Sequence, residues 1–153
     1  MRYLAIDYGN KRTGLAICDP DETIASPLGV LEGRKDLARR VAQIARREQA
    51  DAFVVGLPLN MDGTEGHQAK LVRQFASELC KCSDISVCFQ DERLSSFGAE
   101  EKLDAAGYSR KRKAGRIDAV AAAEILSAFM EARRTHGSSH PPAPDSPPDQ
   151  RTY

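Results

Sequence analysis

The sequence has no tryptophan, few aromatic residues and no excess of either charge. Of its 153 residues 6% are aromatic, and 22 Lys and Arg balance 22 Asp and Glu, so the net charge is zero. This balance argues against a polybasic, histone-like binder, and any nucleic-acid site must therefore be a local patch. The chain also lacks a run of about 18 apolar residues, which a membrane-spanning helix needs, and a signal-peptide pattern at residues 1–10. We therefore expect a cytoplasmic protein with no membrane partner.

Cysteine is scarce and poorly spaced for a metal site. The four cysteines include a single C-x-C pair, Cys80 and Cys82, with no histidine nearby, whereas zinc sites usually show paired C-x-x-C spacings. In the cytoplasm such residues stay reduced, so we expect free thiols in or near the core. A domain of this length buries roughly 68–70% of the surface of its unfolded chain and needs no disulfide or structural metal.

Apolar residues are nearly absent from the C-terminal segment, residues 137–153. This segment holds five of the eight prolines, among Ser, Gly and Asp, and such a composition favours disorder because it cannot bury a core. We therefore predict one folded domain, residues 1–136, followed by a disordered proline-rich tail. Whether the tail tethers a partner stays open at this point.

The folded part contains apolar runs of two kinds. Short runs typical of strands occupy residues 2–7, 13–18, 24–31, 53–57 and 85–89. Runs at helical spacing occupy residues 36–49, 68–79, 95–106 and 116–133. The first three strands are joined by short turns and predict an antiparallel meander, whereas the later strands are entered through helices. This order predicts an α/β fold, a mixed five-stranded sheet with helices on both faces.

Three acidic residues lie where apolar elements begin or end, which is unusual for a charge. Asp7 closes the first strand, Glu92 follows the fifth strand, and Asp118 opens the last helix. Asp118 also stands on the most apolar stripe of that helix, so its carboxylate should point toward the sheet. If the first strand is central, the three side chains can converge at one end of it. Each residue alone also has a structural explanation. Asp7 could form a turn, Glu92 could pair with Arg93 at the surface, and Asp118 could be a charge at a helix N-terminus.

Converging carboxylates require a proton or a cation between them. Two of them about 4 Å apart repel by roughly 4 kcal/mol at an effective dielectric constant near 20. An all-oxygen ligand set favours Mg²⁺ or Mn²⁺ over zinc. Two such ions would stabilise the attacking and leaving oxygens of a phosphodiester displacement, which is the chemistry of a nucleic-acid hydrolase.

Four sequence blocks, taken together, resemble the bacterial YqgF/RuvX family. They comprise residues 5–16, 54–64, 91–96 and 113–122, they occur in the family's order, and the resemblance covers residues 1–134. It implies an RNase H-like fold whose mixed five-stranded sheet has its three antiparallel strands first. The family has been described as a Holliday junction resolvase and as the nuclease that processes the 5′ end of precursor 16S rRNA. The resemblance assigns the catalytic, metal-binding acids to Asp7, Glu92 and Asp118.

Two regions near these acids are candidates for binding substrate. Lys11 and Arg12 follow a turn at Gly9 and could hold phosphate, although a solvated hairpin carries similar cations. The glycine-rich loop at residues 56–66 follows a strand, where open α/β sheets place ligands. Within this loop Asn60 and Thr64 have polar atoms suited to substrate.

A dense basic cluster lies just before Asp118. It contains Arg110, Lys111, Arg112, Lys113 and Arg116. Such a run is usually a solvated surface, yet its position suits it to guide a polyanion toward the carboxylates, independently of base sequence. Arg93 is open to two interpretations, an ion pair with Asp91 or a contact with the scissile phosphate.

These residues predict a hydrolase, a metal-dependent nuclease of structured nucleic acid that uses two Mg²⁺ or Mn²⁺ ions. The first expectation is processing of precursor 16S rRNA during ribosome biogenesis, on the free RNA or a ribosomal particle. The alternative is cleavage of branched DNA, a four-way junction, which calls for two sites in a dimer. Nothing in the sequence marks a dimer surface, and we expect a monomer or a weak homodimer.

Two further readings belong to other classes of protein. The Asp-x-Gly after the first strand also occurs in actin-like and sugar-kinase phosphotransferases, but these need a duplicated domain for which this chain has no room. A ribosome-associated binding module without catalysis would not need the three acids. Failure to bind Mn²⁺ would favour that last interpretation.

Overall fold

A computed structural model of the chain describes residues 1–92 and 110–135, with only the backbone for residues 110–117. Its elements are β1 (Tyr3–Asp7), β2 (Arg12–Cys18), β3 (Ala25–Glu32), α1 (Leu37–Arg47), β4 (Ala52–Leu57), α2 (His67–Cys82), β5 (Ser86–Asp91) and α4 (Arg110–Thr135). The helix predicted at residues 95–106 and the tail predicted to be disordered, residues 137–153, lie outside the described residues. The division into a domain and a tail therefore stays a prediction.

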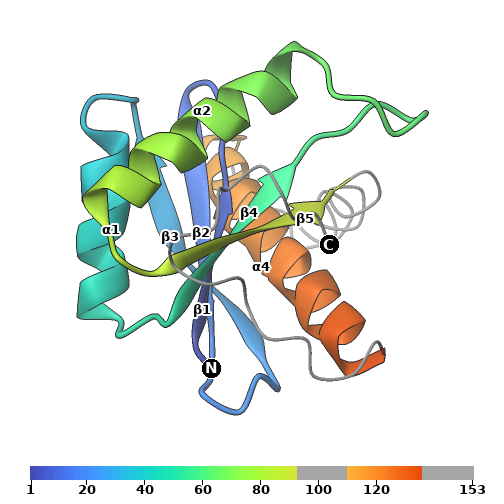
Figure 1. Cartoon of the computed structure of the whole chain (residues 1–153). Coiled ribbons are helices and arrows are strands. Elements are labelled where there is room, and N and C mark those ends of the chain that lie inside the picture. Colours follow the sequence, from blue (N-terminus) through green and yellow to red (C-terminus); the bar gives the residue numbers. More distant parts are fainter. Residues whose placement is uncertain (93–109, 136–153) are drawn as a thin grey trace.

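The five strands form one mixed sheet in the order β3-β2-β1-β4-β5. Strand β2 pairs antiparallel with β1 and with β3, while β4 runs parallel to β1 and to β5. The parallel pairs need crossover connections, and α1 and α2 supply them (Figure 1). The predicted five-stranded mixed sheet with three antiparallel strands first is confirmed, and β1 lies at its centre.

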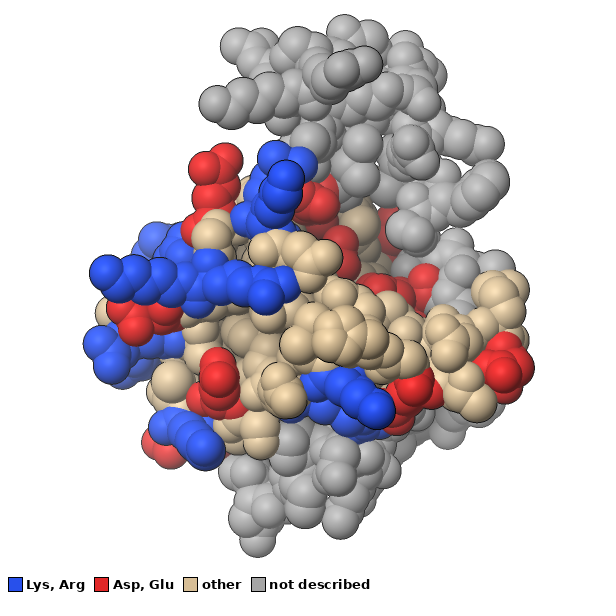
Figure 2. Space-filling model, turned by 90° about the horizontal axis from the view of Figure 1, so that it is seen from above, with Lys and Arg blue, Asp and Glu red and all other residues tan. Residues whose placement is uncertain are grey.

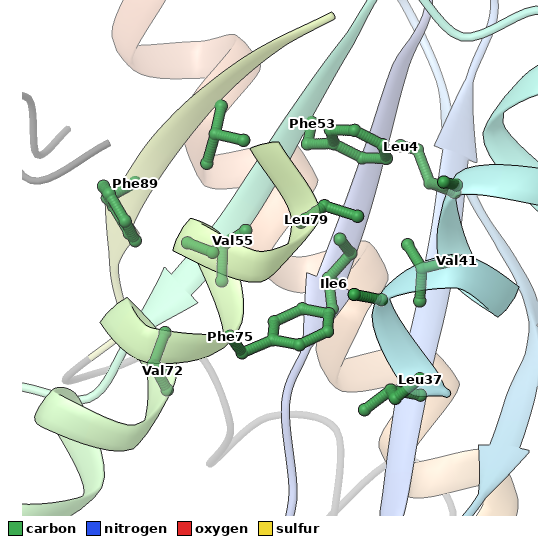
Figure 3. Close-up of a cluster of buried hydrophobic side chains, with 14 of the residues drawn as sticks. Leu4, Ile6, Leu37, Val41, Phe53, Val55, Val72, Phe75, Leu79 and Phe89 are labelled. Atoms are coloured by element: carbon green, nitrogen blue, oxygen red, sulfur yellow. The ribbon is translucent and has the colours of Figure 1, made fainter. Parts of the chain in front are cut away.

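Helices cover both faces of the sheet, as predicted, because the central strands alternate apolar side chains between two cores. On one face Val41 of α1 and Phe75 of α2 converge on Ile6 of β1 (Figure 3). On the other face α4 packs against the sheet, where the rings of Tyr3 and Phe129 meet edge to face with centroids 5.0 Å apart. The strand β4 is buried along its whole length, as a strand between two helical layers must be.

The helix α4 begins six residues earlier than the sequence pattern indicates. It starts at Arg110, so Asp118 lies within the helix and does not open it, and the prediction of a helix beginning at Arg116 is wrong. The early start has a physical reason, since Lys and Arg are good helix formers. A single glycine such as Gly115 costs a helix only about 1 kcal/mol and need not end it.

All four cysteines are free thiols. Cys18 and Cys88 are buried in the core and Cys80 is partly buried, whereas Cys82 is exposed, so the expectation of a place in or near the core is wrong for Cys82. Among the helices that the structure describes, none is both long enough and apolar enough to cross a bilayer.

Close contact between α4 and β2 depends on Gly14. A Cβ atom at this position would collide with the backbone carbonyl of Asp118. The helix is able to approach this closely because its facing side chains are also small, with Ala119 and Ala122 buried beneath it. The absence of a side chain at Gly14 therefore sets the depth at which Asp118 sits on the sheet.

We expect Gly14→Ala to destabilise the fold by about 1–3 kcal/mol, the usual cost of overpacking a core. The matched control is Gly29→Ala on the neighbouring strand β3, where an added Cβ meets no atom within 4 Å. Urea unfolding of both variants measures the difference. Equal stability of Gly14→Ala and the wild type would show that α4 does not rest on this glycine.

Candidate active site

Four residues form a row across the sheet at the C-terminal end of β1. Asp7 pairs with Gly14 of β2, and Gly56 of β4 pairs with Gln90 of β5. Because Ile6 lies beside Val55, the next positions, Asp7 and Gly56, are neighbours too. The row faces α4, since Ala5 and Val54, two positions earlier on their strands, belong to the core beneath that helix.

Two glycines in this row make room for the other two acids. A Cβ atom on Gly56 would collide with Oε2 of Glu92, whose carboxylate therefore lies directly over the end of β4. The backbone N–H of Glu92 donates a 3.2 Å hydrogen bond to the carbonyl of Leu57, which fixes the turn after β5. Gly14 admits Asp118 on the opposite side. Asp7 thus stands between Glu92 and Asp118.

The pKa values of all three carboxyl groups are raised in this arrangement. The pKa of Asp7 is raised from 3.8 to about 7, first by burial and second by the nearby Asp118. Burial, then Asp7 and Asp91, raise the pKa of Glu92 from 4.5 to about 8. Asp7 therefore interacts with both of the other acids, and strongly raised carboxyl pKa values in one place are typical of functional sites.

Asp118 has a cationic partner. The Nε of Arg12 donates a 3.2 Å hydrogen bond to Oδ2 of Asp118, and both side chains are partly exposed. Burial raises the pKa of Asp118, and the Arg12 guanidinium opposes that rise. The structure thus brings the predicted phosphate-binding Arg12 to the acids, whereas Lys11 is exposed on the adjoining turn.

The residues fit a divalent cation in their donor chemistry. Three carboxylates supply only oxygen ligands, as Mg²⁺ and Mn²⁺ prefer, and mutual repulsion is the force that a bound cation relieves. As the side chains stand, however, no group of three His, Cys, Asp or Glu within the described part of the chain is arranged to hold an ion. Asp7 interacts with its two neighbours pairwise, and the metal-binding role of the three acids stays a prediction.

Asn60 and Thr64 are exposed, and their side chains bind each other. Nδ2 of Asn60 donates to Oγ1 of Thr64 over 2.9 Å, and Oγ1 of Thr64 donates to Asp62 over 2.6 Å. The backbone N–H of Asn60 donates to the carbonyl of Thr64, and that of Gly63 donates to the carbonyl of Asn60, so that the same loop, which connects β4 to α2, is closed. The structure therefore gives both residues a structural role, and their predicted contact with substrate stays untested.

For the other predicted substrate residues the structure describes either the backbone alone or nothing. Arg93 lies outside the described residues. The basic cluster occupies the first two turns of α4, and the backbone there leads directly to Asp118. The cluster residues are Arg110, Lys111, Arg112, Lys113 and Arg116. Their predicted role in binding phosphate also stays a prediction.

The sequence reasoning missed three participants in this site. Gly14 lies inside a predicted strand and Gly56 where a predicted strand meets the glycine-rich loop, and a glycine inside an apolar strand can signal close approach of another group. Gln90 completes the row and is only 8% exposed, and among the described residues its Oε1 has no hydrogen-bond partner. A buried glutamine at the end of an apolar strand is the signal that could have identified it.

Comparison with known proteins gives a consistent result. The family model described as "RuvX: Holliday junction resolvase" matches residues 1–132. A protein of Anaeromyxobacter sp. (strain Fw109-5), named "Putative pre-16S rRNA nuclease", is 45% identical over 136 residues, which cover 87% of this chain and 98% of that protein. A protein of the same name from Roseiflexus sp. (strain RS-1) is 40% identical over 135 residues, or 87% and 96% of the two chains.

Solved structures share the fold at low sequence identity. RuvC of Thermus thermophilus in complex with a Holliday junction substrate matches with a TM-score of 0.55 and 17% identity, over 93% of this chain and all of that chain. The Fowlpox virus resolvase bound to Holliday junction DNA matches with a TM-score of 0.51 and 17% identity, over 86% and 98%. These similarities confirm the RNase H-like architecture predicted from the sequence.

The raised pKa values predict that Asp7→Asn stabilises the protein at high pH. In the folded state Asp7 and Glu92 hold protons more tightly than in the unfolded chain, so the free energy of unfolding falls as pH rises from about 4 to about 8. Asparagine cannot ionise. Because a tenfold change in proton affinity is worth about 1.4 kcal/mol, we expect a gain of a few kcal/mol at pH 8 and little change at pH 4.

Urea unfolding at both pH values, without divalent cations, measures this effect. The exposed Asp21, changed to Asn, is the matched control and should unfold like the wild type at both pH values. Equal destabilisation by Asp7→Asn at both pH values would contradict a buried, repelling carboxylate.

Proposed function

This chain belongs to the RuvX family, and we propose that it is a divalent-metal-dependent nuclease that processes the 5′ end of precursor 16S rRNA. It is a hydrolase of phosphodiester bonds. The observation that carries the proposal is the packing of Glu92 and Asp118 on either side of Asp7, each admitted by a glycine of the same row. The relatives named above, 40–45% identical, support RNA as the substrate.

Asp7, Glu92 and Asp118 are the residues that would hold Mg²⁺ or Mn²⁺, and we infer two ions. When bound, such ions lower the pKa of water and neutralise charge that develops on the phosphate. Arg12 forms an ion pair with Asp118 in this structure, and the same guanidinium is able to contact a phosphate that binds beside the three acids. Hydrolysis adds water across the bond between phosphorus and the 3′ oxygen, leaving a 5′ phosphate and a 3′ hydroxyl.

The partner in this function is nucleic acid, as free precursor rRNA or as a ribosomal particle, and the expected compartment is the cytoplasm. The basic cluster at the start of α4 would bind phosphates without reading bases. A monomer or weak homodimer suffices, because a single cut needs one site.

Cleavage of four-way DNA junctions is the second candidate function. The description of the matching family favours it, and the Thermus thermophilus and Fowlpox virus proteins of the same fold were solved with Holliday junctions. Resolving a junction takes two symmetric cuts and therefore a dimer. Sedimentation of the protein with a junction would detect that dimer.

Asp7→Asn should abolish cleavage while the fold is kept. With Mg²⁺ or Mn²⁺ the wild type should cleave a precursor 16S rRNA fragment faster than a four-way DNA junction. The variant should lose at least ~10²-fold in rate, because it removes the central carboxylate of a metal site. Gel assays of both substrates measure the rates.

The control for this assay is Asp21→Asn, which should cut like the wild type. Retained activity in a folded Asp7→Asn protein would refute hydrolysis at this site. Faster cutting of the junction by a dimer would instead favour the second candidate function.

A further inference from the structure

A second basic surface lies at the same end of the sheet as the acids. The turn between β1 and β2 adjoins the loop between β3 and α1 (Figure 1), where the backbone N–H of Gly33 donates a 2.9 Å hydrogen bond to the carbonyl of Lys11. Arg40 holds the loop between β3 and α1 in place, because its Nη1 donates hydrogen bonds of 3.0 and 3.4 Å to the carbonyls of Glu32 and Lys35. The two loops therefore form one continuous surface.

Arg34 is held on this surface in a fixed orientation. Its guanidinium lies over the ring of Tyr8, 5.6 Å from the centroid, and Nη2 donates a 2.5 Å hydrogen bond to Oδ1 of Asn10. Tyr8 in turn stacks on Phe75, with centroids 4.9 Å apart. Guanidinium carries five N–H donors. Within the described residues only one of them is used in a hydrogen bond, so a planar, oriented cation lies over Tyr8, the residue that follows Asp7 in the chain.

Exposed cations gather around Arg34. We call Lys11, Arg34, Lys35 and Arg39 the α1 basic patch, and all four side chains are exposed. The exposed acids Glu32 and Asp36 lie at the loop between β3 and α1, and Glu78 and Lys81 of α2 line a hollow together with Arg34 and Arg39, so five exposed cations stand against three acids. Figure 2 looks onto this end of the molecule and shows Lys and Arg side chains gathered on one side of it, beside acidic side chains. A local excess of positive charge in a neutral chain requires an explanation.

We propose that the α1 basic patch binds phosphates of the nucleic-acid strand whose cleavage is proposed above, and the inference rests on that function. Asp7 faces α4, whereas Tyr8 packs against the core beneath α1 and α2. A strand that crosses the end of β1 therefore meets the acids on one side and Arg34 on the other. The patch holds the strand by its backbone, so the contact is independent of base sequence.

Arginine suits this role better than lysine because its planar fork binds a phosphate through two parallel hydrogen bonds. The ring of Tyr8 and the amide of Asn10 orient that fork before substrate arrives. The first two turns of α4 and the α1 basic patch then contact the substrate on opposite sides of the carboxylates.

The test compares two double variants of the same helix region. Arg34→Gln with Arg39→Gln removes two cations of the patch, and Arg46→Gln with Arg47→Gln removes two exposed cations from the last turn of α1, at its far end. Binding of a precursor 16S rRNA fragment is measured over a range of salt concentrations in EDTA, so that no cleavage occurs.

We expect the patch variant to bind roughly tenfold more weakly at 0.1 M salt and to lose about 1.5 from the slope of log K against log salt, since each phosphate contact contributes about 0.7–0.9. The control variant should keep the wild-type slope. Lys35→Gln with Arg39→Gln, which leaves Arg34 on Tyr8, serves if the first variant misfolds. Arg34→Lys should keep most of the slope but bind more weakly.

An unchanged slope in the folded patch variants, or an equal loss in the control, would overturn the inference. The outcome is separable from that of the nuclease assay. Cleavage by the wild type with no effect of the patch on the slope refutes the patch alone. A reduced slope with no cleavage of either substrate supports the patch as a nucleic-acid contact and refutes the proposed nuclease.

Discussion

The rest of this structure depends on one constraint, the burial of mutually repelling carboxylates at the end of the central strand. Asp7 cannot leave that position because β1 is fixed by pairing on both sides, and Glu92 and Asp118 are packed against it. Burial raises the pKa of all three side chains, and repulsion by neighbouring acids raises those of Asp7 and Glu92 further, so the ionised site opposes folding near neutral pH. A fold that bears this cost is typical of a functional site, where a cation or substrate supplies the missing charge.

The surrounding fold supplies the geometry that this arrangement needs. Register between β2, β1, β4 and β5 places Gly14, Asp7, Gly56 and Gln90 in one row, and the two glycines leave space on either side of the acid. Chain segments far apart in sequence meet there, since the pair of Arg12 and Asp118 joins residues 106 positions apart. The backbone of the first two turns of α4 leads to one flank of the acids, and the α1 basic patch lies on the other flank.

Sequence patterns predicted the strands, the mixed sheet and the positions of Asp7 and Glu92 at the ends of strands, because alternation and helical spacing are local properties. They did not predict the start of α4, since a glycine weakens a helix without ending it and packing against the sheet decides the boundary. Local patterns also could not show that Gly14 and Gly56 admit Asp118 and Glu92, because these contacts are long-range. The polar atoms of Asn60 and Thr64 predict substrate binding, which stays a prediction, and local patterns could not show that the two side chains also bond to each other across a loop.

The most direct test of a shared cation site is calorimetric titration with Mn²⁺ at pH 7 in two buffers of different ionisation enthalpy. Asp7 and Glu92, with pKa values raised to about 7 and about 8, hold protons that a divalent cation must displace. The account predicts Mn²⁺ binding with net proton release, and both should diminish in Glu92→Gln. Absence of binding, or binding without proton release that Glu92→Gln leaves unchanged, would contradict it.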